Sequence, residues 1–161
     1  MLYELDPLTL SGTVIGVPIV NVQGFQRASR YLVDRRDLNR YFPGNPTGSS
    51  ASRIAHSFFS DVVGHCDVLV DVHTGSQRRV NLPQLRADMK TPAAAELARK
   101  FDDTIVLHSV GARGTLRRAA VDAGIPAVTF EAGGPLELQD RAVADGVRGI
   151  RNLMRNLAMV E

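Results

Sequence analysis

The sequence is poor in cysteine, tryptophan and lysine. Its 161 residues include one cysteine, Cys66, and no tryptophan. A single cysteine excludes an internal disulfide and any zinc site built on several cysteines. It is consistent with a reducing compartment, so we expect a cytoplasmic protein. No uninterrupted apolar run approaches the ~20 residues that span a bilayer, so we expect no membrane association.

The positive charge comes almost entirely from arginine, because Lys90 and Lys100 are the only lysines. The formal net charge is +2, although the sequence pI is near 9.0. Arginine binds carboxylates and phosphates through a planar fork. The arginines alternate with acidic residues instead of forming one basic face, so we expect no nucleic-acid binding.

The segment from Cys66 to Gly75 has the pattern of a buried strand, a short valine-rich run that stops at a glycine. Asp71 and His73 stand at its carboxyl end, two positions apart, and side chains alternate along a strand. Both should therefore lie on one face, where a neutral imidazole can bind zinc and a carboxylate can orient it. The alternative is a histidine that ends a strand and makes only local hydrogen bonds.

Segments with the patterns of strands and of helices alternate along the chain, as is typical of an α/β protein. Hydrophobic residues make up 44% of the chain, enough for a real core. The alternation predicts a mostly parallel sheet with helices on both faces. We expect strands at 12–20, 66–72, 104–108 and 125–130, helices at 49–63, 92–101, 115–123 and 136–158, and a helix tail at 2–8. Loops are expected at 22–48 and 74–91.

The 22–48 loop is long enough to suggest a function. At its centre Asn39 offers an amide and Arg40 a bidentate fork, which together suit a substrate carboxylate. The alternative is that Asp37 and Arg40 pair with each other to hold the loop. The carboxyl ends of parallel strands meet at one edge, so His73 and Glu131 should share that edge, within reach of this loop.

The other three histidines lack partners at metal-ligand spacing. His56 is expected on a helix, His65 just after that helix, and His108 at the end of a strand. We interpret all three as structural or surface residues.

Three motifs, taken together, resemble the succinylglutamate desuccinylase/aspartoacylase family of zinc-dependent deacylases, which are related to the metallocarboxypeptidases. The motifs are Asp37-Leu-Asn-Arg-Tyr-Phe-Pro-Gly44, Asp71-Val-His-Thr-Gly75 and Thr129-Phe-Glu-Ala-Gly-Gly134. Their order and spacing also match, over nearly the whole chain.

The resemblance implies a zinc-carboxypeptidase-like fold and a role for each of five residues. His73 would be a zinc ligand, and Glu131 would be the general base that activates zinc-bound water. Asn39 and Arg40 would bind the substrate carboxylate, with Arg30 of the same loop contributing. The implied reaction cleaves an amide bond of an N-acyl amino acid or a similar small carboxylate.

The resemblance also implies that parts of the family structure are missing. In the family, two more zinc ligands form a His-x-x-Glu motif ahead of the strand expected at Gly12, and this sequence contains no such motif. A smaller carboxyl-terminal β domain is missing as well. We therefore expect one truncated, N-terminally incomplete catalytic-type domain over residues 1–161. Zinc is the expected cofactor of the family, and His73 alone would hold it poorly.

Two hypotheses for the function follow. The first is a zinc deacylase core, which could be inactive as this fragment. The second is a non-catalytic descendant that keeps the carboxylate-binding loop and binds its ligand without metal. The residues do not identify the acyl group or the amino acid. An exposed sheet edge would favour association between copies of the chain, and the sequence does not decide between a homo-oligomer and a monomer.

Overall fold

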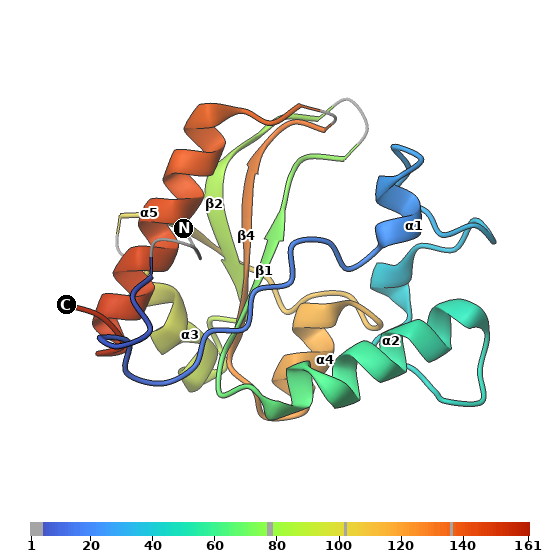
Figure 1. The fold of residues 1–161 in the computed structure, drawn as a ribbon, viewed down its shortest axis with the longest axis horizontal. Coiled ribbons are helices and arrows are strands. Elements are labelled where there is room, and N and C mark those ends of the chain that lie inside the picture. Colours follow the sequence, from blue (N-terminus) through green and yellow to red (C-terminus); the bar gives the residue numbers. More distant parts are fainter. Residues whose placement is uncertain (1–4, 77–78, 102, 136) are drawn as a thin grey trace.

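The computed structural model describes residues 5–76, 79–101, 103–135 and 137–161, which form a sheet with helices on both faces (Figure 1). The strands are β1 (Leu69–His73), β2 (Asn81–Ala87), β3 (Ile105–His108) and β4 (Ala127–Gly133). The α-helices are α1 (Val22–Phe25), α2 (Ser50–Asp61), α3 (Pro92–Arg99), α4 (Leu116–Asp122) and α5 (Asp140–Asn156), and the 3-10 helices are η2 (Leu38–Arg40) and η3 (Val63–His65).

The four strands lie in the order β1-β4-β2-β3. β1 pairs with β4 and β2 pairs with β3 in parallel, whereas the central pair of β2 and β4 is antiparallel. The predicted α/β architecture with a mostly parallel sheet is confirmed. The antiparallel central pair was not predicted.

Two predictions about the strands are wrong. The expected loop at 74–91 contains β2, which is a central strand of the sheet. The expected strand at 12–20 makes no ladder with any described residue, and its residues form bends and irregular backbone. Residues 2–4 of the helix tail predicted at 2–8 lie outside the described residues, and the Asp6 carbonyl oxygen accepts hydrogen bonds from the backbone N–H groups of Thr9 and Leu10.

The remaining predicted elements are present with small changes at their ends. Helices expected at 49–63, 92–101 and 115–123 correspond to α2 with η3, α3 and α4, and the helix expected from 136 is α5, with Leu136 outside the described residues. Strands expected at 66–72, 104–108 and 125–130 correspond to β1, β3 and β4.

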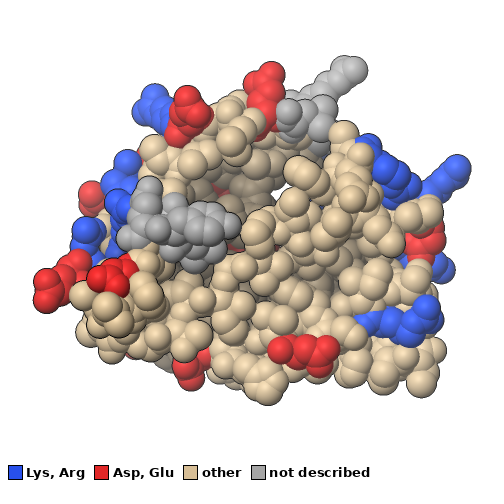
Figure 2. All heavy atoms as spheres, viewed as in Figure 1, with Lys and Arg blue, Asp and Glu red and all other residues tan. Residues whose placement is uncertain are grey.

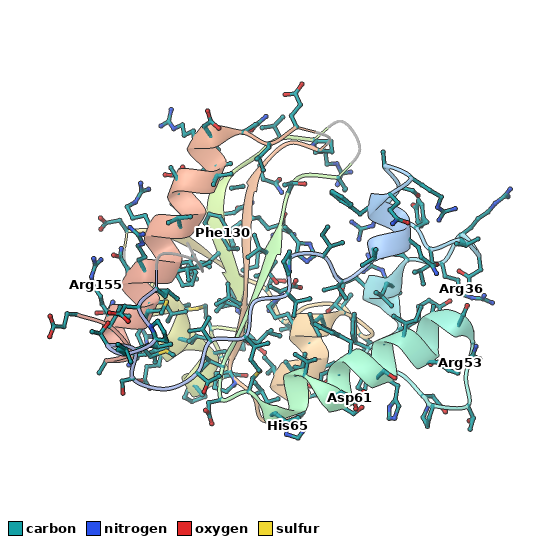
Figure 3. The ribbon with its side chains drawn as sticks, in the orientation of Figure 1. Arg36, Arg53, Asp61, His65, Phe130 and Arg155 are labelled. Atoms are coloured by element: carbon teal, nitrogen blue, oxygen red, sulfur yellow. The ribbon has the colours of Figure 1, made fainter. Side chains whose placement is uncertain are left out.

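One face of the sheet packs on α3 and α5 around two stacked rings. The ring centroids of Phe101 and Phe130 lie 6.1 Å apart, and the two residues are 1% and 2% exposed. Figure 3 shows Phe130 between the sheet and α5. Gly149 lets α5 approach these rings, because a Cβ at this position would lie 2.5 Å from the Phe101 ring.

The opposite face is only partly covered, and this leaves room for a site. Helix α4 packs against β1 and β4, and its Ala119 and Ala120 belong to the same buried cluster as Ala127 at the start of β4. The carboxyl-terminal halves of β1 and β4 lie beyond this cluster. Figure 2 shows the surface hollowed between β1 and α1.

None of the helices among the described residues is both long enough and apolar enough to cross a lipid bilayer.

We expect Phe130→Ala to lower the free energy of unfolding by about 3–5 kcal/mol, because it leaves a cavity beside Phe101. Urea denaturation measures this change. Phe25, which is 68% exposed in α1, is the matched control, and Phe25→Ala should cost under about 0.5 kcal/mol. Equal losses in the two variants would contradict the core described above.

Candidate functional site

The partly covered face of the sheet carries polar side chains on two adjacent parallel strands. In the β1–β4 register Asp71 lies opposite Thr129, and His73 lies opposite Glu131. Side chains alternate along β4, so Val128 and Phe130 point into the apolar core. Thr129 and Glu131 point to the other face. Glu131 is 8% exposed, so a carboxylate is buried next to an imidazole.

Asp71 and His73 form an ion pair, as their shared face predicts. The distance from His73 Nε2 to Asp71 Oδ2 is 2.9 Å. Burial lowers the pKa of His73, but the hydrogen bond to Asp71 and the negative charges of Asp71 and Glu131 outweigh burial and the opposing charge of Arg30. The net effect places the pKa above its ordinary value of about 6.5. Nδ1 remains as the nitrogen that could bind a metal.

Glu131 is held from β2, the strand that the sequence analysis missed. Asn81 Nδ2 donates a hydrogen bond to Glu131 Oε2 at 2.6 Å, and Arg86 Nη1 lies 3.6 Å from Glu131 Oε1. The two donors therefore approach different oxygens of the same carboxylate.

A further arginine, Arg117, lies in the first turn of α4 and is buried, with 5% of its surface exposed. Its Nη1 donates to the Ser109 carbonyl oxygen at 2.7 Å and its Nη2 to Ser109 Oγ at 3.3 Å. Burial lowers the pKa of its guanidinium, and the charges of Asp71 and Asp88 act in the opposite direction. The site thus combines carboxylates with buried or half-buried arginines.

The residues predicted in the 22–48 loop have structural partners. Arg30 donates from Nε and Nη2 to Asp37 Oδ2 at 3.1 and 3.0 Å, so Asp37 pairs with Arg30 and not with Arg40. Asn39 Oδ1 accepts from the Leu116 backbone N–H at 2.8 Å and so joins the loop to the start of α4. Arg40 is exposed and donates to the Asn39 carbonyl oxygen.

The structure brings three of the five predicted residues into one neighbourhood. Glu131 and Arg30 both lie close enough for their charges to act on His73. Among the described hydrogen bonds and ion pairs, none joins Asn39 or Arg40 to His73 or Glu131. Their assignment to the substrate carboxylate stays a prediction.

The three histidines set aside in the sequence analysis lie away from this neighbourhood or at its margin. His65 is exposed at the end of η3, where Figure 3 shows it pointing outward, and His56 is half-buried on α2. His108 Nδ1 accepts from the Met89 N–H at 3.1 Å and lies 3.9 Å from Asp88 Oδ1.

Sequence reasoning missed Asn81, Arg86 and Arg117. Asn81 and Arg86 fall within the loop expected at 74–91, and Pro83 between them is a residue that central strands rarely contain. Arg117 belongs to a short helix with arginine at two successive positions, and the sequence does not indicate which of the two is buried. The weak signal for β2 was the alternation of Leu85 and Ala87 with polar residues.

A complete metal site is not formed by the residues that the structure describes. Within that part of the chain no three His, Cys, Asp or Glu side chains lie close enough to hold one ion. Catalytic zinc usually takes three protein ligands. His73 would fit as one of them, with Asp71 as its orienting carboxylate.

We expect the His73 imidazole of the metal-free chain to titrate above pH 6.5, and to titrate at lower pH in Asp71→Asn, which removes a negative partner. Its raised pKa means that the protonated pair stabilises the fold below about pH 6.5, and that this contribution is lost as pH rises through the folded-state pKa. NMR of the ring protons follows both titrations, with exposed His65 as the internal control. An unchanged His73 midpoint in Asp71→Asn would refute the pair.

Comparison with known proteins connects this arrangement to one family. Residues 1–157 match the family model described as the succinylglutamate desuccinylase/aspartoacylase catalytic domain. An N-alpha-acetyl-L-2,4-diaminobutyric acid deacetylase of Halomonas elongata is 29% identical over 160 residues, covering 94% of this chain and 47% of the relative.

Solved structures agree with this match. A succinylglutamate desuccinylase/aspartoacylase from Rhodobacter sphaeroides superposes with a TM-score of 0.87 at 28% identity, over 99% of this chain and 49% of that one. A protein of Shewanella amazonensis assigned as a metallopeptidase shares the fold, with a TM-score of 0.64 at 12% identity, over 89% of this chain and 63% of that one. The chain spans about half the length of the first two relatives. The chain belongs to the succinylglutamate desuccinylase/aspartoacylase family.

Proposed function

We propose that this chain is the core of a deacylase that hydrolyses the amide bond of an N-acyl amino acid. The observation that carries the proposal is the position of Glu131, whose buried carboxylate lies opposite His73 on the partly covered face of the sheet. The family membership supports the same reaction class.

In this proposal Glu131 is the general base. It takes a proton from water as the water oxygen attacks the acyl carbonyl carbon, and it returns a proton to the amine as the C–N bond breaks. Its burial limits competing solvent, and the strands that hold it are rigid elements of the sheet. Cleavage yields a free carboxylic acid and a free amino acid.

Arginines of the 22–48 loop would bind the carboxylate of the substrate. Arg30 already holds a carboxylate, that of Asp37, through two of its nitrogens, and its charge reaches His73. Arg40 is exposed and has donors to spare beyond its bond to Asn39. A guanidinium fork matches the geometry of a carboxylate, so this loop suits an acidic substrate.

Zinc is the cofactor that we propose for this reaction class. When bound, such an ion would make water more acidic and polarise the acyl carbonyl. His73 would supply one ligand through Nδ1, but the described residues do not complete a three-ligand set. We therefore assign no step of the reaction to the ion.

A second candidate function is a carboxylate-binding protein that works without metal, and the exposed guanidinium of Arg40 in the 22–48 loop favours it. Arg30 and Arg40 would then retain a ligand that the protein does not cleave. Binding of an N-acyl amino acid to metal-free protein, with no amino acid released after zinc is added, would favour this second function.

We expect Glu131→Gln to lower the turnover number by a factor of about 100 or more, because the amide keeps the shape of the carboxylate but cannot accept the proton. The assay follows amino acid release from N-acetyl and N-succinyl amino acids with zinc supplied. Glu96→Gln is the matched control, since Glu96 is largely exposed on α3 and bonded to Lys100. Full activity in Glu131→Gln would refute its role as the base.

We expect Arg40→Ala to weaken substrate binding by about 2–5 kcal/mol, because it would leave a bound carboxylate without its partner. The Michaelis constant reports this loss for a cleaved substrate, and calorimetry reports it for a ligand that is not cleaved. Arg53 is exposed on α2 and is the control arginine. An unchanged Michaelis constant for Arg40→Ala would remove Arg40 from the binding site.

A further inference from the structure

Two side chains of β2 approach the Glu131 carboxylate, one at each oxygen. Asn81 Nδ2 donates to Oε2 at 2.6 Å, and Arg86 Nη1 lies 3.6 Å from Oε1. Asn81 and Arg86 stand five positions apart on β2, near its two ends. Residues an odd number of positions apart on a regular strand face opposite sides of the sheet. Their convergence on one carboxylate therefore needs an irregularity in β2.

That irregularity is a β-bulge around Pro83. Gln84 pairs with Glu131, and Asn81 pairs with Gly133, so three steps along β2 match two steps along β4. The extra residue shifts the alternation and brings Asn81 onto the same face as Gln84 and Arg86. Bulges are known to re-aim side chains near active sites, and proline is tolerated within a sheet at such positions.

Arg86 has a feature that packing does not explain. Its Nε is buried and has no hydrogen-bond partner among the described residues, while its side chain as a whole is 41% exposed. A buried donor without a partner typically costs about 1–3 kcal/mol. Arginine at this position therefore costs folding stability that a smaller apolar residue would not cost. What the arginine provides is a guanidinium beside Glu131.

We propose that Asn81 and Arg86 are positioning residues that orient the carboxylate of Glu131 on the partly covered face, and that the bulge at Pro83 brings Asn81 into this arrangement. The proposal rests on the role of Glu131 as the base. A hydrogen bond to Oε2 and an ion pair at Oε1 together restrict rotation of the carboxylate about its terminal bond, so that it presents its remaining lone pairs to water in a defined orientation. Asn81 and Arg86 act on the reaction through Glu131 and not through contact with substrate.

The first test needs no turnover. The full chain is labelled with ¹⁵N-asparagine, and the side-chain amide of Asn81 is assigned as the signal lost in Asn81→Ser. We expect its protons to exchange with solvent at least about 10-fold more slowly than those of exposed asparagines, and Glu131→Ala to abolish this protection. Gln84→Met is the matched control, because Gln84 pairs with Glu131 across the ladder but has no side-chain hydrogen bond to a described residue.

Protection that survives in Glu131→Ala, in a protein that the same spectrum shows to be folded, would overturn the arrangement. Glu131→Gln covers the case in which Glu131→Ala fails to fold. Its amide can accept only through one oxygen, so the Asn81 signal should shift or exchange faster. An Asn81 signal unchanged in both position and exchange rate would overturn the proposal equally.

The second test measures turnover in the full chain with zinc supplied. Asn81→Ala and Arg86→Met should each lower the turnover number by about 10-fold, which is at the low end of what is typically lost when a residue that orients an active-site group is removed. The Michaelis constant should stay within about twofold. Arg86→Lys should restore part of the loss, and Gln84→Met should have no effect. A raised Michaelis constant with unchanged turnover would mean that these residues bind substrate, which would overturn the proposal.

A double-mutant cycle shows whether the two residues act through Glu131. In a Glu131→Gln background, Asn81→Ala and Arg86→Met should cost less than about twofold each, because the group that they position no longer accepts a proton. A full additional 10-fold loss in that background would contradict the proposal. If the unaltered chain shows no turnover at all, the proposed function fails, and the exchange experiment alone decides whether Glu131 is held as described.

Discussion

The candidate site depends on the position of β4 between two strands of opposite direction. β4 runs parallel to β1 on one side and antiparallel to β2 on the other. Glu131 therefore lies opposite His73 on one strand and Gln84 on the other, and it can interact with side chains from both. No single strand or loop could surround one carboxylate in this way. Strand pairing in the sheet places residues that are far apart in the sequence next to one another.

The charged groups of the site lie beside partners of opposite charge. Burying a carboxylate or a guanidinium without such a partner would cost folding free energy. Asp71 pairs with His73, Glu131 lies beside Arg86, and Arg117 lies within the field of Asp71. The pKa of His73 is raised as a result of this balance.

The sequence was sufficient for the parts of the site that obey simple periodicity. The two-residue spacing of Asp71 and His73 correctly predicted a shared face, and Glu131 was correctly placed next to His73 at the sheet edge. β2 is hard to predict because Pro83 breaks the pattern of a central strand, and a bulge cannot be read without knowing its partner strand. The strand expected near Gly12 has suitable residues, but such a segment becomes a strand only when another strand pairs with it.

The central claim is that this fold hydrolyses an amide whose amino acid carries a free carboxylate. The most direct measurement incubates the full chain and zinc with N-acetyl and N-succinyl amino acids, each beside its carboxamide-blocked counterpart, and follows the products by NMR. The account predicts equal amounts of free acid and free amino acid from the unblocked compounds and at least about 10-fold slower release from the blocked ones. Equal hydrolysis of both forms, or binding without any release, would contradict it.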